Sequence, residues 1–223
     1  MRMWMQKPGR VCRRALLCVL AGVLVFPLSV SADMEDFTLK PHLRKLRYVE
    51  EFYALFAQNH MPATDSIERN IWFLQLALNL PYKHPSYALC VIRTEAEHEQ
   101  YKRLLRSRIA FLLAQSFMQL GYRYDKEEIY FFNHKYAKEL NEGFEIARYY
   151  YREAIVYWDE ARRVASEVYR KRSVRLQGAL MEAIQDEARR IQAGDINYRK
   201  NIDFRLKELD RKQRLLAQGE SFR

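Results

Sequence analysis

The feature that most constrains the fold is a stripe of apolar residues between positions 144 and 168. Their spacing alternates between three and four, so all of them lie on one face of a single α-helix. The stripe comprises Phe144, Ala147, Tyr151, Ala154, Trp158, Ala161, Ala165 and Val168. Its first part alternates aromatic rings with alanines, which lets a neighbouring backbone approach at each alanine while the next ring fills the space beside it. The stripe therefore predicts a long helix packed against at least one other helix.

The rest of the chain also has a helical composition. All 6 prolines lie at or before Pro85, and the residues after it are rich in Ala, Leu, Glu, Arg and Lys. No stretch shows the sustained alternation of a half-buried strand. The sequence therefore predicts an all-α fold.

Two helices are predicted before Pro85. The first covers residues 42–58 and has an amphipathic pattern. Asp65 and Glu68 then have the spacing of a capping box, in which each side chain bonds the backbone of the other residue. The second helix should begin there and end near Leu80.

A third, long helix is predicted to begin at a second capping box, formed by Thr94 and Glu97. It should run to Leu120, with Gly121 as a left-handed C-terminal cap. Asp125 could then cap a short helical turn in the aromatic segment that follows.

The first 32 residues have the parts of a secretory signal peptide. Basic residues from Arg2 to Arg14 precede an uncharged apolar run, and Val30 and Ala32 occupy the positions that a signal peptidase reads. We expect cleavage after Ala32 and a periplasmic location. The alternative is an uncleaved anchor, although an apolar run of roughly 14 residues is short for a span of about 20.

Charge is unevenly distributed. The net charge of the whole chain is +10, but five basic residues and no acid lie in the signal segment, so the remainder carries +5. Residues 33–169 carry a net charge of −1 and residues 170–223 carry +6. For an exported protein, an acidic protein surface or anionic headgroups at a membrane surface are better partners for this excess than nucleic acid. The alternative is a solvated helix with ion pairs such as Glu208–Lys212.

The C-terminal residues 171–223 are predicted to form a long basic helical extension, with Gly194 at a junction between two helices. Ile202, Leu206, Leu209 and Leu216 make a thin apolar stripe, which is typical of a coiled coil or of a helix that binds a partner. The extension could therefore also mediate self-association. The sequence divides into the signal peptide (1–32), a helical domain (33–170) and this extension (171–223).

Motifs for catalysis, metal binding or a cofactor are absent from the sequence. Glu95 and His98 match half of a di-iron site, but such a site needs a second Glu-x-x-His motif, which no other histidine supplies. Cys90 could act as a nucleophile with His84 or His98 as its base. The apolar residues around Cys90 favour a buried, unreactive thiol instead. We therefore expect no cofactor, no metal and no enzymatic activity.

Aromatic residues between Tyr122 and Trp158 have two interpretations. They could complete the core, or some of their rings could line a groove for a partner peptide or helix. With the basic cluster that follows, they give the candidate partner-binding residues Tyr122, Tyr124, Tyr130, Phe131, Tyr150, Tyr157, Arg170, Lys171, Arg172 and Arg175.

Two segments carry the pattern of a tetratricopeptide helix pair. Leu120-Gly121-Tyr122-Arg123-Tyr124 matches the end of the first helix, and Ala147, Tyr151 and Ala154 match the second, although the two matches are about 14 residues further apart than one repeat allows. We therefore predict a tetratricopeptide-like core with an aromatic insertion.

The segments 66–89, 99–106, 120–126, 130–133 and 149–161 together resemble a set of exported helical proteins of spirochaetes. This set contains tetratricopeptide-like proteins associated with the collar around the periplasmic flagellar motor. The resemblance covers about residues 66–165 and implies a scaffold role, with no active-site residues.

These observations predict a non-enzymatic periplasmic scaffold or adaptor that binds other periplasmic or motor-associated proteins, with the flagellar collar as the specific hypothesis. The alternative is a periplasmic solute- or cargo-binding accessory protein, such as a chaperone or a transporter partner. A closed pocket that holds a small molecule would favour this alternative, whereas an open groove would favour the scaffold.

Overall fold

The computed structural model describes residues 45–58, 64–125, 136–170 and 174–218. The chain divides into two compact units, residues 1–45 and 46–223, and of the first unit only Lys45 is described. The predicted signal peptide (1–32) and the candidates Tyr130, Phe131, Lys171 and Arg172 lie outside the described residues.

The fold is all-α, as predicted. The described residues form α-helices and one short 3-10 helix, and no strand occurs among them. None of the described helices combines the length and the apolar character that crossing a membrane requires.

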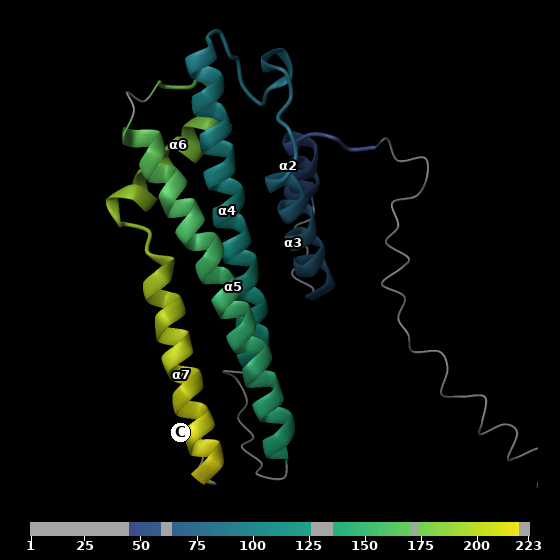
Figure 1. The fold of residues 1–223 in the computed structure, drawn as a ribbon, viewed down its shortest axis with the longest axis vertical. Helices are drawn as coiled ribbons and strands as arrows, with labels where there is room; N and C mark the ends of the chain where they lie inside the picture. The colour runs from purple at the N-terminus through teal and green to yellow at the C-terminus, as the bar shows by residue number, and fades with distance from the viewer. Residues whose placement is uncertain (1–44, 59–63, 126–135, 171–173, 219–223) are drawn as a thin grey trace, which may run out of the picture. The chain divides into compact units, whose positions relative to one another are not determined.

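Two long antiparallel helices, α4 (Glu95–Asp125) and α5 (Ala137–Arg170), form the centre of the second unit (Figure 1). All eight residues of the predicted stripe on α5 are buried, so that prediction is confirmed. On the facing helix, Leu104, Ala110 and Leu113 are fully buried in the same core. The stripe packs because each alanine of α5 lets α4 approach closely while the rings between them fill the remaining space.

The prediction that Gly121 ends the long helix is wrong. Helix α4 continues for four more residues, and Gly121 lies within it. A Cβ atom at this position would lie 2.5 Å from Cε1 of Tyr151, a distance shorter than any real contact. Gly121 is therefore required by the close approach of the Tyr151 ring, and not by the backbone conformation of a cap.

The N-terminus of α4 has the predicted capping box. The backbone N–H of Glu97 donates to Thr94 Oγ1 at 3.2 Å, and the Thr94 N–H donates to Glu97 Oε2 at 3.1 Å. The other predicted box is wrong in its position, because α3 (Thr64–Leu78) already includes Asp65 as a helical residue. Helix α3 begins two residues earlier than the box requires.

Helix α2 (Val49–Gln58) is shorter than its predicted range, since residues 45–48 precede it without helical structure. It packs on α3, which in turn packs on α4. The buried Glu50 of α2 accepts a hydrogen bond from Tyr101 Oη of α4 at 2.9 Å and another from the Lys83 N–H at 3.1 Å. This carboxylate therefore connects α2 to α4 and to the segment between α3 and α4. That segment contains the 3-10 helix η2 (Pro85–Tyr87).

At the start of α2, the backbone N–H of Arg47 donates to Glu51 Oε2 at 2.9 Å. This hydrogen bond, together with the neighbouring Lys83 ammonium group, lowers the pKa of Glu51 below its ordinary value.

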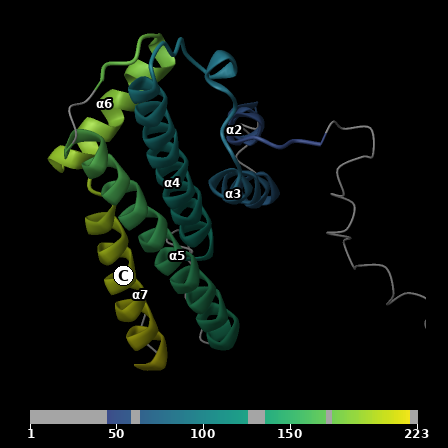
Figure 2. The same ribbon diagram turned by 45° about the horizontal axis from the view of Figure 1, so that its top comes forward.

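The C-terminal helices do not form an extension that projects from the domain. Helices α6 (Ala179–Ala193) and α7 (Tyr198–Gln218) belong to the same compact unit as α4 and α5. Figures 1 and 2 both show α7 beside α5, on the side away from α2 and α3. Gly194 ends α6 with a φ of 87°, which confirms the predicted junction.

The apolar stripe of α7 packs against other helices of the same chain. Ile202, Leu209 and Leu216 are buried in the common core, so the partner of this helix is α5 of the same chain. The predicted pair Glu208–Lys212 does not form, because Glu208 pairs with Arg211 and Lys212 turns inward.

The tetratricopeptide-like character of the core stays a prediction. The two matching segments do meet, since Tyr151 lies against Gly121. However, α4 has 31 residues and α5 has 34, whereas one complete tetratricopeptide unit has about 34 residues for both of its helices.

Candidate functional site

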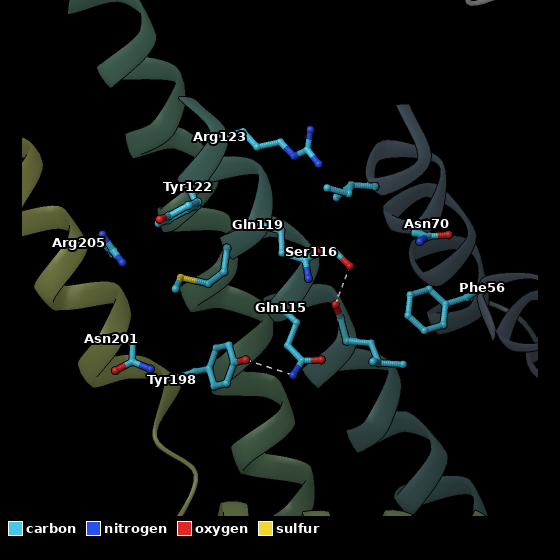
Figure 3. Close-up of a pocket in the computed structure, with 13 residues that line it drawn as sticks. Phe56, Asn70, Gln115, Ser116, Gln119, Tyr122, Arg123, Tyr198, Asn201 and Arg205 are labelled. Carbon is cyan, nitrogen blue, oxygen red and sulfur yellow. Dashed lines mark hydrogen bonds between the residues drawn. The ribbon is translucent and has the colours of Figure 1, made fainter. Parts of the chain in front are cut away.

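A groove runs along the face of α4 between α7 on one side and α2 and α3 on the other (Figure 3). Its volume is about 620 Å³. Helix α4 supplies Leu112, Gln115, Ser116, Met118, Gln119, Tyr122 and Arg123. The flanks are Tyr198, Asn201 and Arg205 of α7, and Phe56, Ile67 and Asn70 of α2 and α3. From Leu112 to Arg123 the floor covers about 16 Å of helix, or three turns.

One end of the groove is neutral and held by a hydrogen bond. The side-chain amide of Gln115 donates to Tyr198 Oη at 3.1 Å. The Tyr198 ring in turn stands edge-on to Phe111, with ring centroids 5.1 Å apart. These contacts fix the start of α7 against α4.

The other end of the groove is basic. The Arg205 guanidinium carbon lies 4.9 Å from the ring centroid of Tyr122, a cation–π distance. Arg123 follows Tyr122 on α4 and lines the same end (Figure 3). None of the described residues that line the groove is acidic.

The structure divides the predicted aromatic candidates between the groove and the core. Tyr122 lines the groove. Tyr124, Tyr150 and Tyr157 instead form a ring cluster around Phe117, in which Tyr157 stacks on Phe117 at 5.4 Å and Tyr124 lies 5.6 Å from Tyr150. All three are half-buried and packed against the core. The core interpretation therefore holds for these three tyrosines, and partner binding by Tyr122 stays a prediction.

Contacts of this ring cluster also reach α3. Gln75 Nε2 donates to Tyr157 Oη at 3.0 Å, which joins α3 to α5 across α4. Burial is the main cause that raises the pKa of Tyr150, and the nearby Glu68 carboxylate is the next largest. These tyrosines position α3, and hence one flank of the groove.

The basic candidates lie away from the groove. Arg170 is exposed at the end of α5, beside a shallow depression that Arg163 and Glu167 also line. Arg175 is exposed in the segment before α6. The structure does not bring these two residues together with the aromatic candidates.

A buried ion pair that sequence reasoning missed joins α7 to α4. Lys212 Nζ lies 2.5 Å from Asp125 Oδ1 and donates to the Asp125 carbonyl oxygen at 3.3 Å. Tyr151 Oη donates to the other carboxylate oxygen at 3.1 Å. Asp125 is the last residue of α4 and is fully buried, and the turn that it was predicted to cap lies outside the described residues. We call these three residues the clamp.

The clamp also explains why an acid is tolerated at a helix C-terminus. A negative side chain there opposes the helix dipole, but the Lys212 ammonium group supplies the favourable cation and bonds the terminal carbonyl group. Farther along the same interface, Arg148 of α5 pairs with Asp210 of α7 at 2.7 Å. Helix α7, and with it the basic flank of the groove, is therefore fixed to α4 and α5.

The residues considered for catalysis are Cys90, His84 and His98. Burial is the main cause that raises the pKa of the Cys90 thiol, and the Glu97 carboxylate adds to it. A raised pKa lowers the fraction of the reactive thiolate. His84 bonds Ser86, and the buried His98 stacks on Tyr101. Within the described part of the chain, no three His, Cys, Asp or Glu side chains lie close enough to hold a metal ion.

The family comparison covers the same helices. Residues 96–218, which span α4 to α7, match the family described as Domain of unknown function (DUF8513). The match includes more than half of the chain, so the chain belongs to this family. No curated protein and no solved structure matches the chain. The matched region contains the whole clamp and two of the three sides of the groove.

Proposed function

We propose that the protein is a non-enzymatic adaptor in a periplasmic assembly, and that the groove on α4 is its binding surface for a partner protein. The observation that carries the proposal is the groove itself. It is elongated, lies between helices, and contains two tyrosines, two arginines and a phenylalanine, residue types that are enriched at interfaces. An elongated groove suits a segment of a partner protein, which would dock as a further helix on the bundle.

The rest of the structure supports a rigid binding surface. The α4–α5 pair is packed along its whole length, and the clamp and Arg148 hold α7 in place. A preorganised surface loses less conformational entropy on binding. The apolar stripe of α7 is buried, so self-association through that stripe would require α7 to leave α5.

The proposed location and assembly depend on the sequence. The signal peptide supports export to the periplasm, and the resemblance to spirochaetal proteins supports the flagellar collar as the particular assembly. A strain that lacks the protein should then form a defective collar and swim poorly. Normal collars and normal swimming in that strain would contradict this assignment.

The partner-binding role is tested by filling the groove. Gln119 is exposed on its floor, and a Gln119→Trp variant should block a docked segment. Gln192 is an exposed glutamine of α6 outside the groove, so Gln192→Trp is the matched control. Affinity purification should recover the same partner proteins with the wild type and the control, and lose them with Gln119→Trp. Equal recovery with all three would overturn the proposal.

A second candidate is a solute- or cargo-binding accessory protein. The groove volume of about 620 Å³ favours it, because small-molecule sites have volumes of about 300–1,000 Å³. Native mass spectrometry of the purified full chain distinguishes the two. A bound small molecule that the Gln119→Trp variant lacks would replace the adaptor proposal.

A further inference from the structure

We propose that the outer face of α7 binds the surface of an anionic phospholipid bilayer, with the helix lying in the plane of the headgroups. This face is formed by five residues with spacings of four, three, four and three, so they share one side of the helix. They are Lys200, Phe204, Lys207, Arg211 and Arg214, and we call them the basic stripe. The inference goes beyond the proposed function and does not depend on the groove.

The basic stripe points away from the helical bundle. Phe204 lies two residues after the buried Ile202, which is a rotation of about 200° around the helix axis. The Phe204 side chain accordingly remains 57% exposed. Figures 1 and 2 show α7 at the edge of the bundle. Four members of the stripe are exposed and accessible to a partner: Lys200, Phe204, Lys207 and Arg214.

The positive charge of the stripe is largely uncompensated. The three acidic residues of α7 are all paired with arginines: Asp203 with Arg199 at 3.1 Å, Glu208 with Arg211 at 2.9 Å, and Asp210 with Arg148 of α5 at 2.7 Å. Lys200, Lys207 and Arg214 form no ion pair with any residue that the structure describes. Arg214 Nε donates to the carbonyl oxygen of Asp210 at 3.3 Å, which leaves its charge unbalanced. Three positive charges therefore lie along about 21 Å of helix.

The composition of the stripe favours a lipid surface over an acidic protein. Lysine is depleted at protein interfaces, and none of the five residues lines the groove or the depression beside Arg170. A lysine ammonium group is a compact charge on a flexible stem, which suits a fluid layer of phosphate groups. An exposed phenylalanine among basic residues is typical of helices at a membrane interface, where the ring enters the boundary between headgroups and acyl chains.

Membrane binding through the stripe leaves the groove open. The α7 residues that line the groove, Tyr198, Asn201 and Arg205, are not members of the stripe. The clamp and Arg148 hold α7 against α4 and α5, so the helix presents the stripe as part of the folded bundle. The bound protein therefore keeps its groove accessible beside the membrane surface.

The test is co-sedimentation of the purified protein, in the form that cells contain, with vesicles of phosphatidylcholine alone or of phosphatidylcholine mixed equally with phosphatidylglycerol. The wild type should prefer the anionic vesicles and lose this preference at about 1 M salt, where the Debye length is about 3 Å. Lys200→Gln combined with Lys207→Gln should weaken binding about 25-fold, since each basic residue near an anionic surface contributes about fivefold. Phe204→Ala should weaken it about tenfold through the loss of the inserted ring.

Controls separate the stripe from net charge and from the fold. Arg93→Gln combined with Arg175→Gln removes the same charge at exposed positions outside α7 and should leave binding unchanged. Circular dichroism checks that each variant is folded. A Phe204→Trp variant locates the contact, since vesicles with brominated acyl chains should quench its added tryptophan fluorescence.

The outcomes are independent of the proposed function, because Gln119→Trp changes only the groove and should bind vesicles as the wild type does. Equal weakening by the two double variants would show that net charge alone acts, and would overturn the inference. Equal binding to both kinds of vesicle, or no binding to the anionic ones, would do the same. A lysine double variant that binds vesicles normally but loses partner proteins in affinity purification would assign the stripe to an acidic protein surface instead.

Discussion

Replacing Lys212 by Met should strongly destabilise the fold. The substitution keeps an unbranched side chain of similar length but leaves the buried Asp125 carboxylate without its counter-ion. Removing one partner of a buried pair costs about 3–5 kcal/mol, because the remaining charge stays desolvated. For a domain of this size, each kcal/mol lowers Tm by about 2–4 °C, so the loss corresponds to about 6–20 °C.

Urea denaturation followed by circular dichroism measures the change, with an unchanged m-value as the check that two-state unfolding is retained. The control is Lys138→Met, since Lys138 is 86% exposed and 4.0 Å from Glu142. The control should show no measurable change, because exposed pairs contribute little.

A compensating variant tests the mechanism itself. Lys212→Met combined with Asp125→Leu and Tyr151→Phe removes the charge, its counter-ion and the hydroxyl group that bonds the carboxylate. It should recover most of the lost stability, since apolar replacements of a whole buried pair are often neutral. A loss below about 1 kcal/mol for Lys212→Met, the range of exposed pairs, would refute the reasoning. So would a triple variant no more stable than the single one.

Three further predictions concern individual positions. Gly121→Ala should lower the stability by about 1–3 kcal/mol through overlap with Tyr151, whereas Gly143→Ala, with its nearest contact at 3.5 Å, should raise it by up to about 1 kcal/mol. Thermal unfolding of both variants checks this, and the reverse order would contradict the packing. Thr94→Ala should cost about 1 kcal/mol and accelerate amide hydrogen exchange in the first turn of α4; unchanged exchange would argue against the cap. The folded-state pKa of Glu51 is lowered. The ionised Glu51 carboxylate therefore stabilises the fold at pH values above its ordinary pKa of 4.5, and this stabilisation is lost as the pH falls through the folded-state pKa. Glu51→Gln should therefore make stability less dependent on pH in acid, and an identical pH profile would count against this assignment.

The central helix was predictable because its signal is local. Eight positions with alternating spacings of three and four must share one helical face, and all of them are buried. The capping box at Thr94 was predictable for the same reason, since its two side chains act over three residues.

Gly121 shows where local reasoning fails. Glycine suits both a left-handed cap and a close approach, and only the ring of Tyr151, 30 residues later, decides between them. The stripe of α7 shows the same limit. Its apolar spacing predicts that the helix packs on a partner, but not that the partner is α5 of its own chain.

The clamp and the groove needed the structure because their members are distant in sequence. Asp125 and Lys212 are 87 residues apart. A signal existed for one of them, since Lys212 lies three residues after Leu209 and hence on the apolar face of α7, where a charge requires a partner. The flanks of the groove belong to three separate segments, and no motif marks them.

The most direct test of the account is site-specific photo-crosslinking in living cells from the floor of the groove. A photoreactive phenylalanine analogue replaces Gln119 in one strain and the exposed control Gln192 in another. The account predicts that Gln119 crosslinks to a discrete partner protein, identified by mass spectrometry, and that Gln192 does not. Crosslinks of equal yield from both positions, or none from Gln119, would contradict a partner-binding groove.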